Sequence, residues 1–126
     1  MAFLRFKDFF IKQILLIAIL SSFAGVKLTA FDVSLVDKKV VVSWSTSVEK
    51  DASHFVVQRS TDGVEFTDAG IIFTEGNYSE KRSYSFKDPI STAGKKVLYY
   101  RLKMVDLDGR YELSQIKQVN LVPTLQ

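Results

Sequence analysis

His54 is the only histidine in the sequence, and it lies close to the acidic residues Glu49 and Asp51. A serine, a histidine and a carboxylate can form a nucleophilic triad, so this neighbourhood is the first candidate for catalysis. The Gly-x-Ser-x-Gly turn that presents a nucleophilic serine is absent, and so are phosphate-binding glycine loops and histidines at metal-ligand spacing. The chain also has no cysteine, which excludes a thiol nucleophile and a disulfide. We therefore expect no catalytic site and no cofactor, with His54 exposed or capping.

Asp106 and Asp108, followed by Gly109, resemble the first positions of a calcium-binding loop. Such a loop needs a glutamate at its twelfth position, and Lys117 stands there. The alternative interpretation is a hairpin turn, in which glycine accepts the positive φ that tight turns require. We expect the turn, and keep Asp106 and Asp108 as weak calcium ligands only.

Arg59 and Arg101 fall on two predicted strands of the same sheet. One interpretation is a surface ladder in which they pair with Asp62, Asp106 or Glu49, and such exposed pairs contribute little stability. The other is a site for an anion or carboxylate on the sheet face. The sequence does not separate these two interpretations.

Phe73 and Tyr78 flank or lie in a predicted loop over residues 74–81. Exposed aromatic side chains are enriched where proteins contact partners. The two residues are our best candidates for a contact surface. The alternative is that Phe73 belongs to the core and Tyr78 only decorates the loop.

Hydrophobic residues alternate with polar ones along most of the chain, which is the pattern of strands with one buried face. The alternation places one set of side chains in the core: Trp44, Phe55, Val57, Tyr84, Phe86, Tyr100 and Leu102. Turns are predicted at Asp62-Gly63 and at Asp108-Gly109. The predicted strands cover residues 28–36, 40–45, 54–60, 64–73, 83–87, 97–106 and 111–121, with a bulge in the last one near Ser114-Gln115. Seven short strands predict one all-β antiparallel sandwich over residues 25–121, followed by a frayed tail over residues 122–126.

The first 24 residues have the three parts of a secretory signal: a basic start, a short apolar stretch and small residues at the end. The uncharged run over residues 13–26 is shorter than the roughly 17–25 residues that a membrane-spanning helix needs. We expect a signal-peptide helix over residues 1–24, cleaved after Ala24, and no stable membrane span afterwards. A retained anchor is the alternative.

The formal charge of +3 belongs mostly to this leader. Its removal leaves 14 basic and 13 acidic side chains, which are interspersed along the chain. Nucleic-acid binding needs clustered lysines and arginines, so we expect no nucleic-acid partner.

Several motifs resemble, in order, a fibronectin type III domain, in particular the module common in secreted proteins of Bacteroidota. The resemblance rests on Leu28-Thr-Ala-Phe31, Trp44-Ser-Thr-Ser-Val-Glu49, Phe55-Val-Val-Gln-Arg59-Ser-Thr-Asp-Gly63, Phe66, Tyr84-Ser-Phe86-Lys-Asp88 and Tyr99-Tyr-Arg-Leu-Lys-Met-Val-Asp-Leu-Asp-Gly109. It implies an immunoglobulin-like sandwich of the kind often found near type IX secretion sorting segments.

A fold of this kind does not specify a function. We expect a noncatalytic interaction or spacer domain that is exported to the periplasm or outside the cell. Its partner is then an unidentified protein or polysaccharide of the cell envelope. The alternative is a module that binds a small ligand, a carbohydrate or a calcium ion.

Overall fold

The computed structural model describes residues 25–122. The predicted signal peptide and most of the predicted tail lie outside these residues. Among residues 25–122 no helix is long and apolar enough to cross a membrane. The strands are β1 (Val26–Val36), β2 (Lys39–Glu49), β3 (Ala52–Ser60), β4 (Thr67–Phe73), β5 (Arg82–Asp88), β6 (Val97–Asp106), β7 (Tyr111–Leu113) and β8 (Lys117–Asn120).

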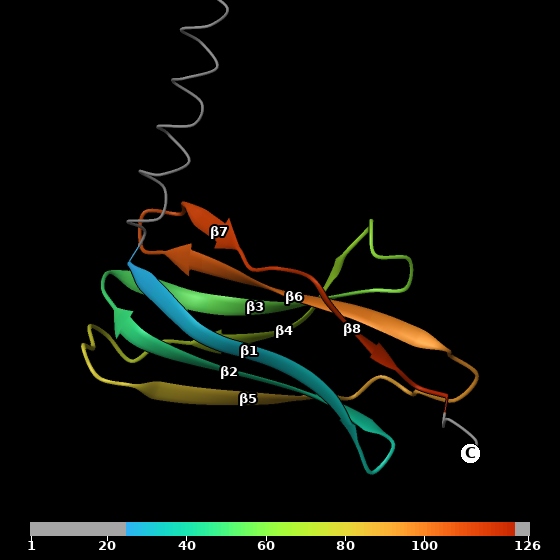
Figure 1. Ribbon diagram of the computed structural model, residues 1–126. Helices are drawn as coiled ribbons and strands as arrows, with labels where there is room; N and C mark the ends of the chain where they lie inside the picture. The colour runs from blue at the N-terminus through green and yellow to red at the C-terminus, as the bar shows by residue number, and fades with distance from the viewer. Residues whose placement is uncertain (1–24, 123–126) are drawn as a thin grey trace, which may run out of the picture.

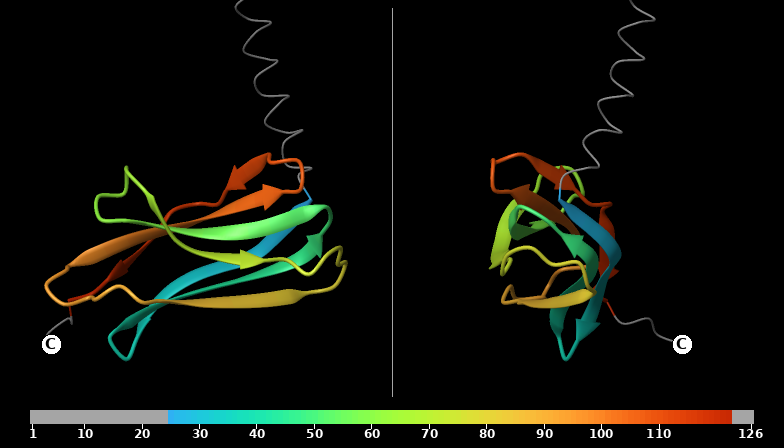
Figure 2. Two further views of the ribbon diagram at one scale, coloured as in Figure 1. Left: turned by 180° about the vertical axis from the view of Figure 1, so that it is seen from behind. Right: turned by 90° about the vertical axis from the view of Figure 1, so that its left-hand side faces the viewer.

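The strands form two antiparallel sheets that face each other (Figures 1 and 2). One sheet has the order β1-β2-β5, and the other has the order β4-β3-β6-β7, with β8 also paired to β6. The chain changes sheets between β2 and β3, between β4 and β5, and between β5 and β6. The predicted all-β sandwich is therefore confirmed, with eight strands in place of seven.

The core lies between the sheets, and alternation along β6 supplies much of it. Leu98, Tyr100 and Leu102 are fully buried and Met104 is nearly so, while the residues between them are only partly buried. Trp44 of β2 stacks on Tyr84 of β5 with the ring centroids 5.4 Å apart. Among the residues predicted as core, Trp44, Phe55, Val57, Tyr100 and Leu102 are buried, whereas Tyr84 and Phe86 are partly buried and pack against them.

The loop predicted over residues 45–53 is much shorter in the structure. Strand β2 continues to Glu49 and β3 begins at Ala52, so only Lys50 and Asp51 connect them. Asp51 has a positive φ of 54°, which lets the chain turn sharply from one sheet to the other. The segment is polar, which suggested a loop. The alternation of buried and exposed residues also breaks near the end of β2, where Val48 is exposed and the next residue, Glu49, is buried.

The predicted turn at Asp62-Gly63 is wider than a two-residue hairpin, and β4 begins at Thr67 instead of residue 64. Asp62 Oδ1 accepts hydrogen bonds from the backbone N–H groups of Val64 (2.8 Å) and Glu65 (2.9 Å). Gly63 adopts a φ of 80°. These bonds stabilise the loop and lower the pKa of Asp62, because they favour its charged form.

The last predicted strand is interrupted at Ser114, which gives two short strands. The backbone N–H of Ser114 donates to the carbonyl of Leu102 (2.9 Å), and its Oγ accepts from the N–H of Leu102 (2.8 Å). Strand β6 therefore pairs first with β8 and then with β7 along its length. The predicted bulge near Ser114-Gln115 is a full break in the strand.

Candidate functional site

The outer face of the five-stranded sheet carries two rows of side chains that include most of its exposed apolar residues. Residues that oppose each other in antiparallel strands point to the same face. The pairing registers align Phe73, His54, Val105 and Tyr111 in one row, and Ile71, Val56, Lys103 and Leu113 in the next. We call these eight residues the outer patch.

The margins of the outer patch are exposed and its centre is covered. Phe73 is 68% exposed, Ile71 and Tyr111 are each 54% exposed and Leu113 is 44% exposed, all on the marginal strands β4 and β7. Val56, on the central strand β3, is only 4% exposed. The exposed apolar side chains therefore form two pairs, one on each margin of the patch. Exposed apolar side chains gathered on one face are typical of contact sites in soluble proteins.

Two polar side chains of the outer patch lie against its aromatic rings. The rings of His54 and Phe73 have centroids 5.5 Å apart, and Lys103 Nζ lies 4.3 Å from the centre of the Tyr111 ring. His54 Nδ1 also lies 2.8 Å from the hydroxyl of Ser53. These contacts order the two exposed rings on opposite margins of the patch.

A polar row borders the outer patch. Arg101 Nε donates to Gln58 Oε1 (2.8 Å), and Gln58 Nε2 donates to Asp68 Oδ1 (3.0 Å). The guanidinium carbon of Arg101 also lies 4.1 Å from the centre of the Phe66 ring. Gln58 thus links Arg101 to Asp68 across three neighbouring strands or their ends.

The prediction that Arg59 and Arg101 share one sheet face is wrong. The cross-strand neighbour of Arg59 is Tyr100, and that of Arg101 is Gln58, so the two arginines project from opposite faces. Arg59 Nη1 donates to both carboxylate oxygens of Asp88 at 2.8 Å. Neither arginine pairs with Asp62, Asp106 or Glu49 among the ion pairs of residues 25–122.

Tyr78 lies beside Glu49, at the end of β2, and is not part of the outer patch. Its backbone N–H and carbonyl exchange hydrogen bonds with Glu49 at 2.6 and 2.7 Å. The guanidinium carbon of Arg82 lies 4.1 Å from the centre of its ring, and the side chain is 39% exposed. Phe73 instead contacts His54, so the two aromatic residues predicted to form a contact surface have different partners.

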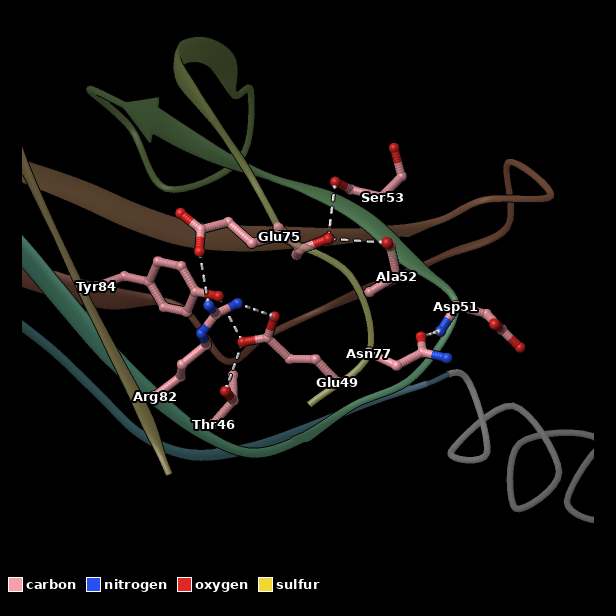
Figure 3. A network of polar contacts seen from close by, with 10 residues as sticks. Thr46, Glu49, Asp51, Ala52, Ser53, Glu75, Asn77, Arg82 and Tyr84 are labelled. Carbon is pink, nitrogen blue, oxygen red and sulfur yellow. Dashed lines mark hydrogen bonds and ion pairs between the residues drawn. The ribbon is translucent and has the colours of Figure 1, made fainter. Parts of the chain in front are cut away.

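Glu49 organises the network in Figure 3. Its side chain is fully buried, and Oε2 accepts hydrogen bonds from Thr46 (2.7 Å) and from the Tyr84 hydroxyl (2.6 Å). Arg82 Nη1 lies 3.7 Å from the other oxygen, and Arg82 Nη2 donates to Glu75 at 2.9 Å. Burial together with the hydrogen bond and charge of Glu49 raises the pKa of Tyr84 to about 12. This network fixes the loop after β4 to the sandwich.

Asp106 and Asp108 line a hollow of about 430 Å³ together with Gly25, Lys50, Asp51, Leu107 and Arg110. Arg110 forms hydrogen bonds with both oxygens of the Asp108 carboxylate: its backbone N–H donates to Oδ1 (2.9 Å) and its side-chain Nε donates to Oδ2 (2.8 Å). Gly109 has a φ of 88° and closes the turn with a hydrogen bond to the carbonyl of Asp106 (3.0 Å). Within residues 25–122 no group of three or more histidine, cysteine, aspartate or glutamate side chains could hold a metal ion.

No protein-family model matches the sequence, and no curated protein matches it. The structure is similar to an Fn3-like protein from Clostridium thermocellum, with a TM-score of 0.55, 20% identity, and coverage of 82% of this chain and 98% of that one. The chain has a fibronectin type III-like fold. It is also similar to a β-1,2-glucanase from Parabacteroides distasonis, with a TM-score of 0.55 and 18% identity over 80% of this chain, but it spans only 13% of that enzyme.

Sequence reasoning found Phe73 but missed most of the outer patch. Tyr111 and Leu113 are two residues apart on a predicted strand, which puts them on one face but does not show that this face is exposed to solvent. The register that places them beside Lys103 and Val105 depends on where β7 pairs with β6. The one signal in the sequence was that the apolar residues Tyr111 and Leu113 follow a strand whose outward face includes the charged Lys103.

Proposed function

We propose that this chain is a noncatalytic interaction domain that is exported from the cytoplasm and contacts a protein through its outer patch. The observation that carries the proposal is the exposure of four large apolar side chains, from 44% to 68%, on one sheet face. Large exposed apolar side chains gathered on one face are more typical of contact surfaces than single ones scattered over the surface.

The composition of the outer patch supports a protein partner. Two aromatic and several aliphatic side chains form its apolar area, and Arg101, Gln58 and Asp68 form a polar border. Protein interfaces combine an apolar, aromatic-rich centre with a polar rim in this way. The terminal N–H groups of Arg101 and the carboxylate of Asp68 can then form hydrogen bonds at the rim of the contact.

Export rests on the leader pattern of residues 1–24 and on the resemblance to modules of secreted Bacteroidota proteins. The site of action is then the periplasm, the cell surface or the medium. Mass spectrometry of the protein from fractionated cells tests this step. We expect a mature chain beginning at Gly25 outside the cytoplasm, and full-length chain confined to the cytoplasm would contradict export.

An affinity experiment with matched variants tests the contact surface. The full chain without its leader is immobilised and exposed to solubilised envelope of its own organism, and bound proteins and polysaccharides are measured. A double variant, Tyr111→Ser with Leu113→Ser, removes one margin of the outer patch. Controls are Val64→Ser and Leu107→Ser, which remove residues that are 75% and 72% exposed in loops outside the patch.

We expect one saturable protein partner that the double variant loses and both control variants keep. Equal binding by all variants would reject the outer patch as the contact surface. The alternative, a carbohydrate ligand, is favoured by the exposed rings of Phe73 and Tyr111, since sugar rings stack on aromatic faces. Retention of polysaccharide alone, again lost in the double variant, would establish that alternative and reject a protein partner.

A further inference from the structure

Strand β4 has an open edge with an identifiable set of unpaired backbone groups. Among the described residues, β4 pairs only with β3 and ends the order of its sheet (Figure 2). The N–H of Thr74 donates to the carbonyl of Ser53 in β3 (3.1 Å). Because backbone groups alternate in direction along a strand, the N–H and C=O groups of Ile71 and Phe73 point away from β3.

This edge lacks the features that usually prevent pairing with another strand. Charged residues and proline protect natural edges, and a bulge can twist an edge away. The register with β3 leaves one extra residue, Ala69, as a bulge at the start of β4, but residues 70–74 beyond it are regular and uncharged. The outer strand of the other sheet, β5, carries Arg82 and Lys87 instead.

We propose that β4 pairs with β4 of a second copy of this chain in antiparallel fashion. The outer faces of the two copies lie on the same side only if an outward-facing residue of one strand opposes an outward-facing residue of the other. Pairing Ile71 with Phe73 of the other copy places Ile72 on the twofold axis and lets all four outward backbone groups of each strand form hydrogen bonds. A shift of the register in one direction brings the Ala69 bulge into the pairing, and a shift in the other direction extends it past Phe73, where β4 ends, so this register is the most complete.

The pairing has two consequences that favour it. Each Phe73 ring lies opposite Ile71 of the second copy, and aromatic pairs with β-branched residues stabilise antiparallel strands. No charged residue enters the paired stretch, so like charges do not oppose each other. The two sheets become one continuous sheet with both outer patches on the same side. The inference goes beyond the proposed function, since it does not depend on what the remainder of the patch binds.

Cysteine cross-linking tests the register directly, because the natural sequence has no cysteine. In this register the two Ile72 residues form a pair without mutual hydrogen bonds, with Cα atoms about 4.5 Å apart, which is within disulfide range. The two Phe73 residues are offset from each other by two positions along the strands, so their Cα atoms lie about 9 Å apart, which is too far for a disulfide. We expect Ile72→Cys to form a disulfide-linked dimer under mild oxidation and Phe73→Cys not to. Faster cross-linking of the more exposed Phe73→Cys would indicate random collision and overturn the proposal.

Sedimentation of charged variants gives a second, independent test. The leaderless chain is compared across a wide concentration range, up to millimolar, with Ile71→Lys and with Leu113→Lys on the opposite margin of the same face. We expect the natural chain and Leu113→Lys to reach the mass of a dimer, and Ile71→Lys to remain a monomer. A natural chain that stays monomeric throughout, or loss of the dimer in both variants, would overturn edge pairing. Binding to the envelope partner is measured separately, so failure of the proposed function leaves this test intact.

Discussion

At the scale of single residues, Asp88 connects both sheets. It ends β5, is fully buried, and accepts hydrogen bonds from Arg59 of β3 and from the hydroxyl of Tyr100 of β6 (2.6 Å). The backbone N–H of Ile90 also donates to it at 3.1 Å. A buried carboxylate is tolerated only when its oxygens are paired in this way. Asp88 is therefore a structural residue, and Arg59 is its counter-ion.

Replacement of Asp88 by alanine should destabilise the domain strongly. It leaves the Arg59 guanidinium and the buried Tyr100 hydroxyl without their acceptor, and breaking a buried pair costs about 3–5 kcal/mol. Chemical denaturation measures the change in the free energy of unfolding. The matched control is Asp68→Ala, which removes an exposed carboxylate with one hydrogen bond and should cost less than about 1 kcal/mol. Similar costs for the two variants would show that the Asp88 network is not stabilising.

The raised pKa of Tyr84 leads us to expect a loss of stability at alkaline pH. Burial and Glu49 raise the pKa of Tyr84 to about 12, and burial with Asp88 raises the pKa of Tyr100 as well. Tyrosine in an unfolded chain ionises near pH 10, so the unfolded state releases its protons first as the pH rises. The stabilisation is present below about pH 10 and is lost as the pH rises toward the folded pKa values.

The Tyr84→Phe variant removes one of these two contributions. Its free energy of unfolding should therefore fall less steeply above about pH 10 than that of the natural chain. The difference in slope is at most about 1.4 kcal/mol per pH unit. Urea denaturation at a series of pH values measures both slopes. Parallel curves would contradict the role of Tyr84.

At the scale of the secondary-structure elements, Ser114 separates β7 from β8 while still forming hydrogen bonds with the backbone of β6. Its side chain and backbone together pair both polar groups of Leu102, which is completely buried. Gln115 and Ile116 then leave the sheet, and both are exposed. One serine hydroxyl thus replaces a backbone carbonyl at the point where the pairing changes strands.

The Ser114→Ala variant should cost about 1–3 kcal/mol, because the buried N–H of Leu102 loses its acceptor. Thermal or urea denaturation measures this change. Ser34→Ala, on an exposed position of β1, is a control that should change stability by less than about 0.5 kcal/mol. A Ser114→Ala variant as stable as the control would show that water satisfies Leu102 instead.

Regular alternation made several elements predictable from the sequence. The bounds of β6 were predicted correctly, and Val40, Val42 and Trp44 of β2 share the buried face that their spacing indicated. Asp88 has the same parity as Tyr84 and Phe86, so its inward direction was also readable, but it was interpreted as the end of a strand. The interruption near Ser114 was predicted as a bulge but is a full break in the strand, and the exposed Val48 beside the buried Glu49 was not predicted. Both features depend on pairing with a neighbouring strand.

The candidate site was less predictable, because it depends on the register between distant strands. Phe73 was identified as a contact residue, but its row partners come from β3, β6 and β7. A surface ladder and an anion site were both left open for Arg59 and Arg101, but a shift of one residue in register sends the two arginines to opposite faces. The spacing of two residues within one strand determines whether they share a face. For residues on different strands, the pairing register decides this, and sequence spacing does not give the register.

At the scale of the whole molecule, the Fn3-like sandwich uses its two sheets differently. The polar networks around Glu49 and Asp88 tie the ends of the sandwich together, and the outer face of the five-stranded sheet exposes large apolar side chains on its two margins. Residues 25–126 carry 14 basic and 13 acidic side chains, so steering by a strong field is not expected. Recognition is then expected to depend on apolar contact.

Hydroxyl-radical footprinting of the leaderless chain, with and without solubilised envelope, tests this central claim most directly. Oxidation of exposed side chains is measured residue by residue by mass spectrometry. We predict that Phe73, Tyr111 and Leu113 become protected by the envelope fraction, while Val64 and Leu107 remain as reactive as in the free chain. Protection confined to those two loop residues, or uniform reactivity with and without the envelope fraction, would contradict an interaction through the outer patch.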